Sequence, residues 1–348
     1  MIRAAPWLAA VLLLASSCAP RRIQWQPREV PEAQRTSSFA VVWAGARFHT
    51  APSADAPVVS LAPGGDPREP WARDTFIALR VISERAGWTT LETLGVDQGA
   101  HCAPARPALR PLRLRVHVTS RALVRVTVRD IDQPFQDGTS VALSRGVPLE
   151  PLGRGGLYRA RLGSMSTVVR LEPSAVGTRY LPSEPDGASA SAVGTLSDGA
   201  LRAGIPIVGQ TGRIHSSAHR PIPIWAVEPR GSESVVELRT RCSRLRARVP
   251  AHLVGDGWSS SDAVTPTAPA AGPPSVRAGA PMFWEDGAEA GVVTEPLGLS
   301  DEVEGRGATR CFRRLTHTDS TNPITLCFRA EDVVDPEAAA SGLTTPSE

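Results

Sequence analysis

The stretch Val42-Trp43-Ala44-Gly45-Ala46-Arg47-Phe48 recurs along this 348-residue chain, and the recurrence decides the fold that we expect. Val276-Arg277-Ala278-Gly279-Ala280-Pro281-Met282-Phe283 is the closest copy, and looser copies run from Val141 to Leu149 and from Leu201 to Ile207. Each copy has an apolar strand end, a Gly where the backbone bends or takes a positive φ, and alternating apolar positions that resume a strand. The pattern predicts an all-β protein made of several small barrel-like units in tandem.

Spacing within two of the copies favours an internal duplication. Val58-Val59 lies thirteen and fourteen residues after Gly45, and Val292-Val293 lies thirteen and fourteen residues after Gly279. A duplicated unit would keep this spacing, whereas convergent strand and turn patterning is the alternative.

Composition favours short strands and turns over long helices. The chain has 32 Pro and 30 Gly, while 41% hydrophobic and 21% charged residues are ordinary for a globular protein. Every basic side chain is Arg, and the net charge is only +3. Because a nucleic-acid site needs a concentrated basic face, we expect no nucleic-acid partner.

The N-terminal residues indicate export. Residues 1–17 carry one positive charge at Arg3 and an apolar run from Trp7 to Ala15, which is shorter than the roughly 20 residues that span a bilayer. We therefore expect residues 1–17 to be a secretory signal peptide.

The end of that segment resembles a bacterial lipoprotein signal. Leu14-Ala15-Ser16-Ser17-Cys18 is similar to the motif in which the Cys becomes the first mature residue and carries lipid. The resemblance implies that Cys18 is lipidated, and the absence of Asp after it implies retention at the outer membrane. Ordinary cleavage near Ala19 is the alternative.

Without Cys18, an even number of cysteines remains, which suits disulfides in an exported protein. Cys311 and Cys327 lie in two predicted strands of one hairpin, opposite each other, so we expect them to pair. Cys102 would then pair with Cys242 and tie two middle units together. A metal site is the alternative, but the sequence has no Cys-x-x-Cys pair, and we expect no metal or cofactor.

One part of the chain resembles a known family. Ala46 to Ser53, Pro57-Val58-Val59 and Gly87-Trp88-Thr89 are similar to the bacterial SH3-like domain, whose pattern is a strand, a Pro-Ser turn, a Val-Val strand and a Gly-Trp hairpin. The resemblance covers residues 38–94 and implies a non-catalytic module that binds cell-wall or protein partners. The family closes with a further Gly-Trp-Val strand, which Gly95-Val96-Asp97 does not match.

Two strongly alternating segments, 112–118 and 124–129, predict strands with one buried face and one exposed face. Their exposed positions include Arg113, Arg115, Arg125 and Arg129, which could together bind phosphate or carboxylate groups of an envelope polymer. The alternative is that Arg merely solvates the exposed face of a protein without Lys.

These signals divide the chain into segments. We expect a signal peptide at 1–17, a flexible tether at 18–37, an SH3-like domain at 38–98, β domains at 101–181 and 201–256, a second SH3-like domain at 276–334, linkers at 182–200 and 257–275, and a disordered tail at 335–348.

The sequence contains no Gly-x-Ser-x-Gly elbow, no Walker A loop and no dinucleotide-binding glycine cluster. We therefore expect a non-catalytic cell-envelope lipoprotein that binds or scaffolds cell-wall or protein partners. An envelope hydrolase with dispersed catalytic residues, acting on the cell wall, is the alternative. A subunit of a larger secretion or motility assembly is a third hypothesis.

Overall fold

The computed structural model describes residues 24–25, 32–43, 45–61, 76–93, 112–135, 138–153, 155–162, 165–182, 190–196, 205–206, 213–216, 222–240, 242–256, 274–299, 301–303, 305, 307–314 and 324–335. The protein is mostly β, with several separate sheets and no helix of seven or more residues among these. Helix α2 (Glu32–Arg35) has only four residues. In the described part of the chain no helix has the length and hydrophobicity to span a membrane.

One order of elements recurs four times in the described residues, and we call each occurrence a unit. A unit has a first strand, a two-stranded hairpin that we call the arm, three meandering strands, a 3-10 turn and a closing extended segment. In two of the units the first meandering strand is split into two short strands. The prediction of an all-β fold is confirmed.

Units 1 and 4 form the outer pair. Unit 1 comprises β2 (Phe39–Trp43), arm strands β3 (Phe48–His49) and β4 (Val58–Val59), β5 (Phe76–Arg85), β6 (Trp88–Glu92), β7 (Leu112–Thr119), the turn η4 (Ser120–Ala122) and a bridge from Leu123 to Val42. Unit 4 comprises β24 (Ser275–Val276), arm strands β25 (Pro281–Trp284) and β26 (Glu289–Val293), β27 (Leu297–Gly298), β28 (Glu302–Val303), β29 (Thr309–Arg314), β30 (Ile324–Arg329), η7 (Ala330–Asp332) and β31 (Val333–Val334).

Units 2 and 3 form the middle pair. Unit 2 comprises β8 (Arg125–Thr127), arm strands β9 (Ile131–Pro134) and β10 (Ser140–Leu143), β11 (Pro148–Pro151), β12 (Leu157–Leu162), β13 (Met165–Arg170), η5 (Pro173–Ala175) and β14 (Val176–Gly177). Unit 3 comprises β16 (Gly194–Leu196), arm strands β17 (Ile205–Pro206) and β18 (Arg213–Ser216), β19 (Ile222–Ile224), β20 (Ala226–Arg230), β21 (Glu233–Thr240), β22 (Ser243–Pro250), η6 (Ala251–Leu253) and β23 (Val254–Asp256).

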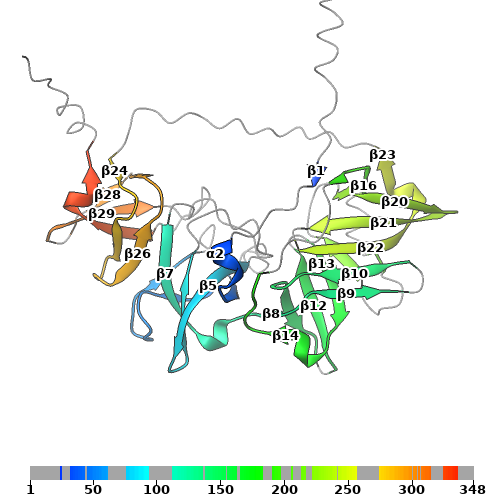
Figure 1. Ribbon diagram of the computed structural model, residues 1–348, viewed down its shortest axis with the longest axis horizontal. Helices are drawn as coiled ribbons and strands as arrows, with labels where there is room; N and C mark the ends of the chain where they lie inside the picture. Colours follow the sequence, from blue (N-terminus) through cyan, green and yellow to red (C-terminus); the bar gives the residue numbers. More distant parts are fainter. Residues whose placement is uncertain are drawn as a thin grey trace, which may run out of the picture.

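The first and last units of the chain share one sheet. Strand β7 of unit 1 pairs with β26 in the arm of unit 4, in the register Leu112↔Val293, Arg113↔Val292 and Leu114↔Gly291. Figure 1 shows the outer pair at one end of the molecule and the middle pair at the other. The first and last units therefore belong to the same half of the protein.

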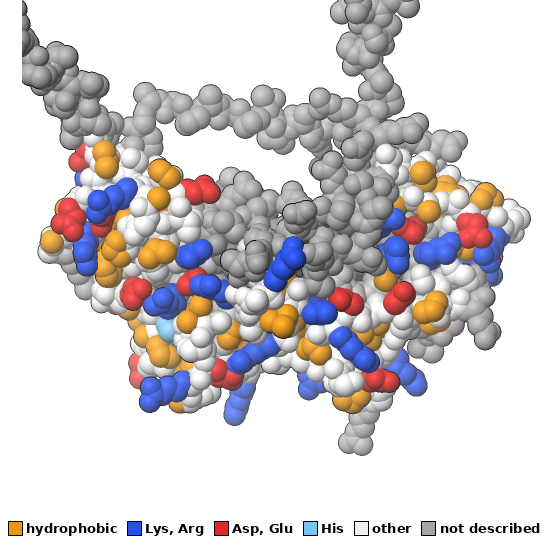
Figure 2. All heavy atoms as spheres, viewed as in Figure 1, with side chains coloured by type: hydrophobic (Ala, Val, Ile, Leu, Met, Phe, Trp, Pro, Cys, Tyr) orange, Lys and Arg blue, Asp and Glu red, His pale blue; other side chains and the backbone are white. Residues whose placement is uncertain are grey.

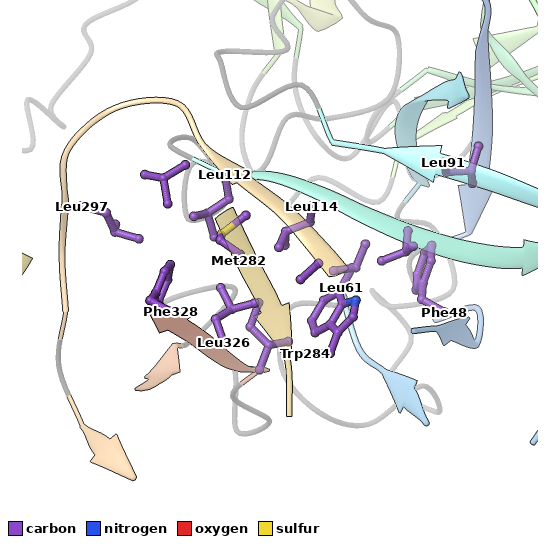
Figure 3. Packing of buried hydrophobic residues seen from close by; sticks show 14 of the residues in the cluster. Phe48, Leu61, Leu91, Leu112, Leu114, Met282, Trp284, Leu297, Leu326 and Phe328 are labelled. Atoms are coloured by element: carbon purple, nitrogen blue, oxygen red, sulfur yellow. The ribbon is translucent and has the colours of Figure 1, made fainter. Parts of the chain in front are cut away.

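A common hydrophobic core accompanies this shared sheet. The alternation of β7 buries Leu112, Leu114, Val116 and Val118, and these pack in one cluster with residues of unit 4 such as Met282. Figure 3 shows Leu112 and Leu114 of β7 among core residues from both units. Because neither unit buries this apolar surface without the other, the outer pair folds as one body.

A separate core fills the middle pair, and a small third cluster joins the halves. In that third cluster Phe39 and Val41 of unit 1 pack with Val126 and Tyr180 of unit 2. The backbone of Phe39 also exchanges two hydrogen bonds with Tyr180, each of 2.9 Å. The two pairs are thus joined through the start of unit 1 and the end of unit 2.

The expected boundary between the first two domains is wrong. Segment 112–118, expected in the second domain at 101–181, is strand β7, which pairs with β6 in the register Leu91↔Val116. It supplies the closing meander strand that residues 95–97 do not provide. Strict alternation predicts which face of a strand is buried, but it does not specify the strand's neighbour.

Two other expected segments contain more structure than the sequence suggested. The linker at 182–200 includes β15 (Ala190–Ser191) and β16, the first strand of unit 3, which pairs with β19 and β23. In the tether at 18–37, β1 (Gln24–Trp25) pairs with β15. Short edge strands in Ser-rich and Pro-rich sequence lack the apolar alternation that would identify them.

The recurring Gly stretch occupies equivalent places in units 1 and 4. It joins the first strand to the arm around Gly45 in unit 1 and around Gly279, whose φ is +85°, in unit 4. The copy at residues 201–204 lies outside the described residues. The copy from Val141 to Leu149 instead joins the arm of unit 2 to its meander, so it is not equivalent. Val58-Val59 and Val292-Val293 both lie in the second strand of an arm, as the shared spacing predicts.

The predicted Cys311–Cys327 disulfide is confirmed. The two residues are directly opposite in the β29–β30 hairpin, and their Cα atoms are 4.0 Å apart. Cys242 is also disulfide-bonded, at the turn between β21 and β22. Its predicted partner Cys102, the lipidation residue Cys18, the signal peptide at 1–17 and most of the tail at 335–348 lie outside the described residues.

Candidate functional site

The four predicted Arg ligands do not form one basic strip. Arg113 and Arg115 lie on β7 in the sheet of the outer pair, whereas Arg125 lies on β8 in a sheet of the middle pair. Arg115 pairs with Glu289 at 3.2 Å, and Arg129 pairs with Glu172 at 3.0 Å. Figure 2 shows Arg side chains interspersed with Asp and Glu on the visible face. This mixed surface favours the alternative that these Arg side chains solvate exposed strands.

A cavity of about 530 Å³ lies where the arm of unit 1 meets unit 4, and we call it the junction cavity. Its lining comes from three places in the chain: Thr50, Pro57, Val58, Val59 and Ser60 from unit 1; Trp284, Glu285 and Asp286 from the end of β25 and its turn; and Ile324 and Thr325 from β30. The volume is within the range of small-ligand sites. No single unit could form this cavity.

A hydrogen bond between the two units holds one wall of the junction cavity. The buried hydroxyl Oγ1 of Thr50 donates to Asp286 Oδ2 at 2.8 Å, and the backbone N–H of Ala288 donates to Asp286 Oδ1 at 2.9 Å. Both oxygens of Asp286 are therefore engaged in positioning the turn. The neighbouring Glu285 is exposed and contributes negative charge to the rim.

Trp284 is the largest side chain in the cavity wall. It is only 2% exposed, and its indole Nε1–H has no hydrogen-bond partner in the described structure. Figure 3 shows the indole among the core residues of the outer pair, with Leu61 and Leu326 among the labelled neighbours in the cluster. A buried donor without a partner costs about 1–3 kcal/mol, so an acceptor at this position would be favoured.

A second cavity, of about 720 Å³, also borders the β25–β26 turn. It shares Trp284, Glu285 and Asp286 with the junction cavity and is also lined by Cys311, Cys327 and Arg329. Residues 284–286 of unit 4 therefore line both cavities. A third cavity, of about 960 Å³, lies in unit 2 beside Phe135 and Arg170.

Two histidines meet where the arm of unit 1 joins its meander. His49 and His117 are paired across β3 and β7, and His49 lies edge-on to Trp88, with ring centroids 5.1 Å apart. Burial, followed by the charges of Arg115 and His49, lowers the pKa of His117. Its ring Nδ1 lies 3.0 Å from Thr90 Oγ1. The neutral form of His117 is therefore the one that the fold favours.

The sequence did not indicate that the residues of the junction cavity lie together. The sequence indicated a strand at Pro57-Val58-Val59, and Trp284 is one of eight Trp. The cavity is lined by residues from three separate parts of the chain, at 50–60, 284–286 and 324–325. The pairing of β7 with β26 brings the two units that carry them together. The repeated spacing of Val58-Val59 and Val292-Val293 was the one signal pointing to the arms.

In the described part of the chain no group of three or more His, Cys, Asp or Glu residues has a geometry that could hold a metal ion. No family model, curated protein or solved structure matches this chain.

Proposed function

We propose that the chain is a non-catalytic, lipid-anchored binding protein of the bacterial cell envelope, held at the outer membrane by Cys18 and built of SH3-like units. Support for the SH3-like assignment comes from unit 1, where strand β4 follows the Pro52-Ser53 turn and the turn at Ala86-Gly87 leads into β6 at Trp88. All four units share one order of elements, so the proposal extends to each of them.

The junction cavity is the observation that carries the binding role. Its walls supply an indole, hydroxyl groups, a carboxylate rim and two strand ends, which are groups suited to recognising a ligand. Asp286, a carboxylate in its wall, already accepts two hydrogen bonds, which suits positioning rather than proton transfer.

Two measurements on the mature protein test this function. Purified in detergent, it should co-sediment with cell-wall sacculi or cross-link in cells to a defined envelope protein, and it should release no soluble fragments from sacculi. Capture of neither polymer nor protein would contradict the binding role, and release of wall fragments would favour the hydrolase instead.

A further inference from the structure

The middle pair shows how two units exchange their arms. Arm strand β10 of unit 2 pairs with β22, the last meander strand of unit 3, and arm strand β18 of unit 3 pairs with β13, the last meander strand of unit 2. Each arm thus extends the other unit's sheet. The exchange is reciprocal.

In the outer pair only half of this exchange is present among the described residues. Arm strand β26 of unit 4 pairs with β7 of unit 1, but arm strand β4 of unit 1 pairs only with β3. Its expected partner by analogy is β30, the last meander strand of unit 4. The junction cavity lies at this place, bordered by Val58 and Val59 of β4 and by Ile324 and Thr325 of β30.

The backbone of β4 presents unpaired groups to the cavity. Thr50 N–H donates to Pro57 C=O at 3.0 Å, so Pro57 directs its carbonyl toward β3. Because backbone directions alternate along a strand, Val58 directs its N–H and C=O away from β3. Its side chain is 49% exposed, which is high for Val in a strand.

The backbone of β30 also presents N–H and C=O groups that no described strand pairs with, from another wall of the cavity. Arg313, which pairs with Thr325, donates its N–H to Asp301 C=O at 3.0 Å, on the side of β29 away from β30. Arg313 and Thr325 are therefore a non-hydrogen-bonded pair, and Thr325 directs its N–H and C=O away from β29. On that side β25 ends at Trp284, opposite Leu326, so no described strand pairs with Thr325.

We propose that the junction cavity binds an extended peptide of a partner protein, which pairs with β4 on one side and β30 on the other and places an Arg or Lys beside Glu285. This inference rests on the proposed binding function and names the class of partner. An extended strand suits this cavity because Val58 of β4 and Thr325 of β30, which both line it, direct backbone N–H and C=O groups away from their own strand partners. The exposed carboxylate of Glu285 in the cavity rim favours a basic side chain on the peptide.

The test selects random nonapeptides by phage display on the full mature protein and measures binding of the synthetic winners by fluorescence anisotropy. We expect peptides enriched in Arg or Lys between β-branched residues. N-methylation of each central amide in turn should weaken binding at least about tenfold, because a strand held on both sides uses all of its central N–H groups. A peptide held by side chains alone would tolerate N-methylation at alternate positions, which would overturn the proposal.

Protein variants locate the binding to the two edges. Val58→Pro and Thr325→Pro each remove a backbone N–H that faces the cavity and takes part in no described strand pairing. The unfolding temperature of both variants should therefore lie within about a few degrees of the parent's. Both should bind the peptide at least about tenfold more weakly. Glu285→Arg should lower affinity for basic peptides, whereas Glu295→Arg, an exposed residue outside the cavity, should not.

Three results would overturn strand addition. The first is that no peptide is selected, and the second is that peptide affinity is unchanged in all three cavity variants. The third is that the protein binds no peptide but associates with itself, and that Val58→Pro abolishes this self-association. Capture of sacculi or of an envelope protein is scored separately. If sacculi or an envelope protein are still captured while the peptide experiments fail, only the strand-addition inference is contradicted, and the proposed binding function is retained.

Discussion

Gly291 lies where the backbones of units 1 and 4 approach closely. Its φ is +129°, and a Cβ at this position would lie 1.8 Å from the carbonyl oxygen of Arg113. Gly291→Ala should therefore destabilise the outer pair by about 3 kcal/mol or more, through backbone strain and a clash between β26 and β7. Denaturant unfolding monitored by Trp fluorescence measures this cost.

Gly279→Ala is the matched control. Gly279 also has a positive φ, +85°, but its Cβ would meet no atom within 4 Å, so only the strain of about 1 kcal/mol remains. Equal losses of stability in the two variants would contradict the close packing of β26 on β7.

His117 gives the outer pair a dependence on pH. Because its pKa is lowered in the folded state, the unfolded chain binds a proton at a pH where the folded chain does not. Stability should be fully present above the ordinary His pKa of about 6.5 and decline as the pH falls below it. Thermal unfolding of the parent and of His117→Gln between about pH 5 and 8 tests this, because the variant should show a shallower decline. An equal slope in both proteins would exclude His117 as the cause.

Thr50 holds the arm of unit 1 against the turn of unit 4. Thr50→Val keeps the shape of the side chain and removes the hydrogen bond to Asp286, so the outer pair should lose about 1 kcal/mol of stability. Asp286→Asn retains an acceptor and should lose less. If Thr50→Val is as stable as the parent in denaturant unfolding, this contact does not hold the junction.

Among the secondary-structure elements, the β29–β30 hairpin is cross-linked by Cys311 and Cys327, which are 16 residues apart. Closing a loop of this length restricts the unfolded chain and contributes about 3 kcal/mol. Cys311→Ala with Cys327→Ala should lower the unfolding midpoint of the outer pair and leave that of the middle pair unchanged. A fall in both midpoints would indicate that the two pairs do not unfold independently.

Hairpins were the elements that the sequence predicted best. The strand at Phe76–Arg85 and its partner at Trp88–Glu92 flank a Gly turn, and Cys311 and Cys327 face each other as expected. Local alternation and turn residues define such pairs, because their partners are near in sequence. The strand at 112–119 was predicted correctly as a strand, but its pairing with β6 and β26 was missed. A long segment separates it from β6, and β26 lies far along the chain.

For the whole molecule, all-β architecture and recurring units were predictable, whereas the pairing of the first unit with the last was not. The repeated Gly stretch and the spacing of Val58-Val59 indicated several similar units, but they contain no information on which units exchange arms. The junction cavity depends on that exchange, so it could not be predicted from residue patterns along the chain.

Hydrogen exchange of the full chain and of a variant lacking residues 257–348, measured by mass spectrometry, tests the shared sheet most directly. The account predicts that β7 (Leu112–Thr119) is slow to exchange in the full chain and loses protection in the shortened one, because β26 and the common core are gone. Strand β22 (Ser243–Pro250) of the middle pair should keep its protection in both. Equal protection of β7 with and without unit 4 would contradict the claim that the first and last units form one body.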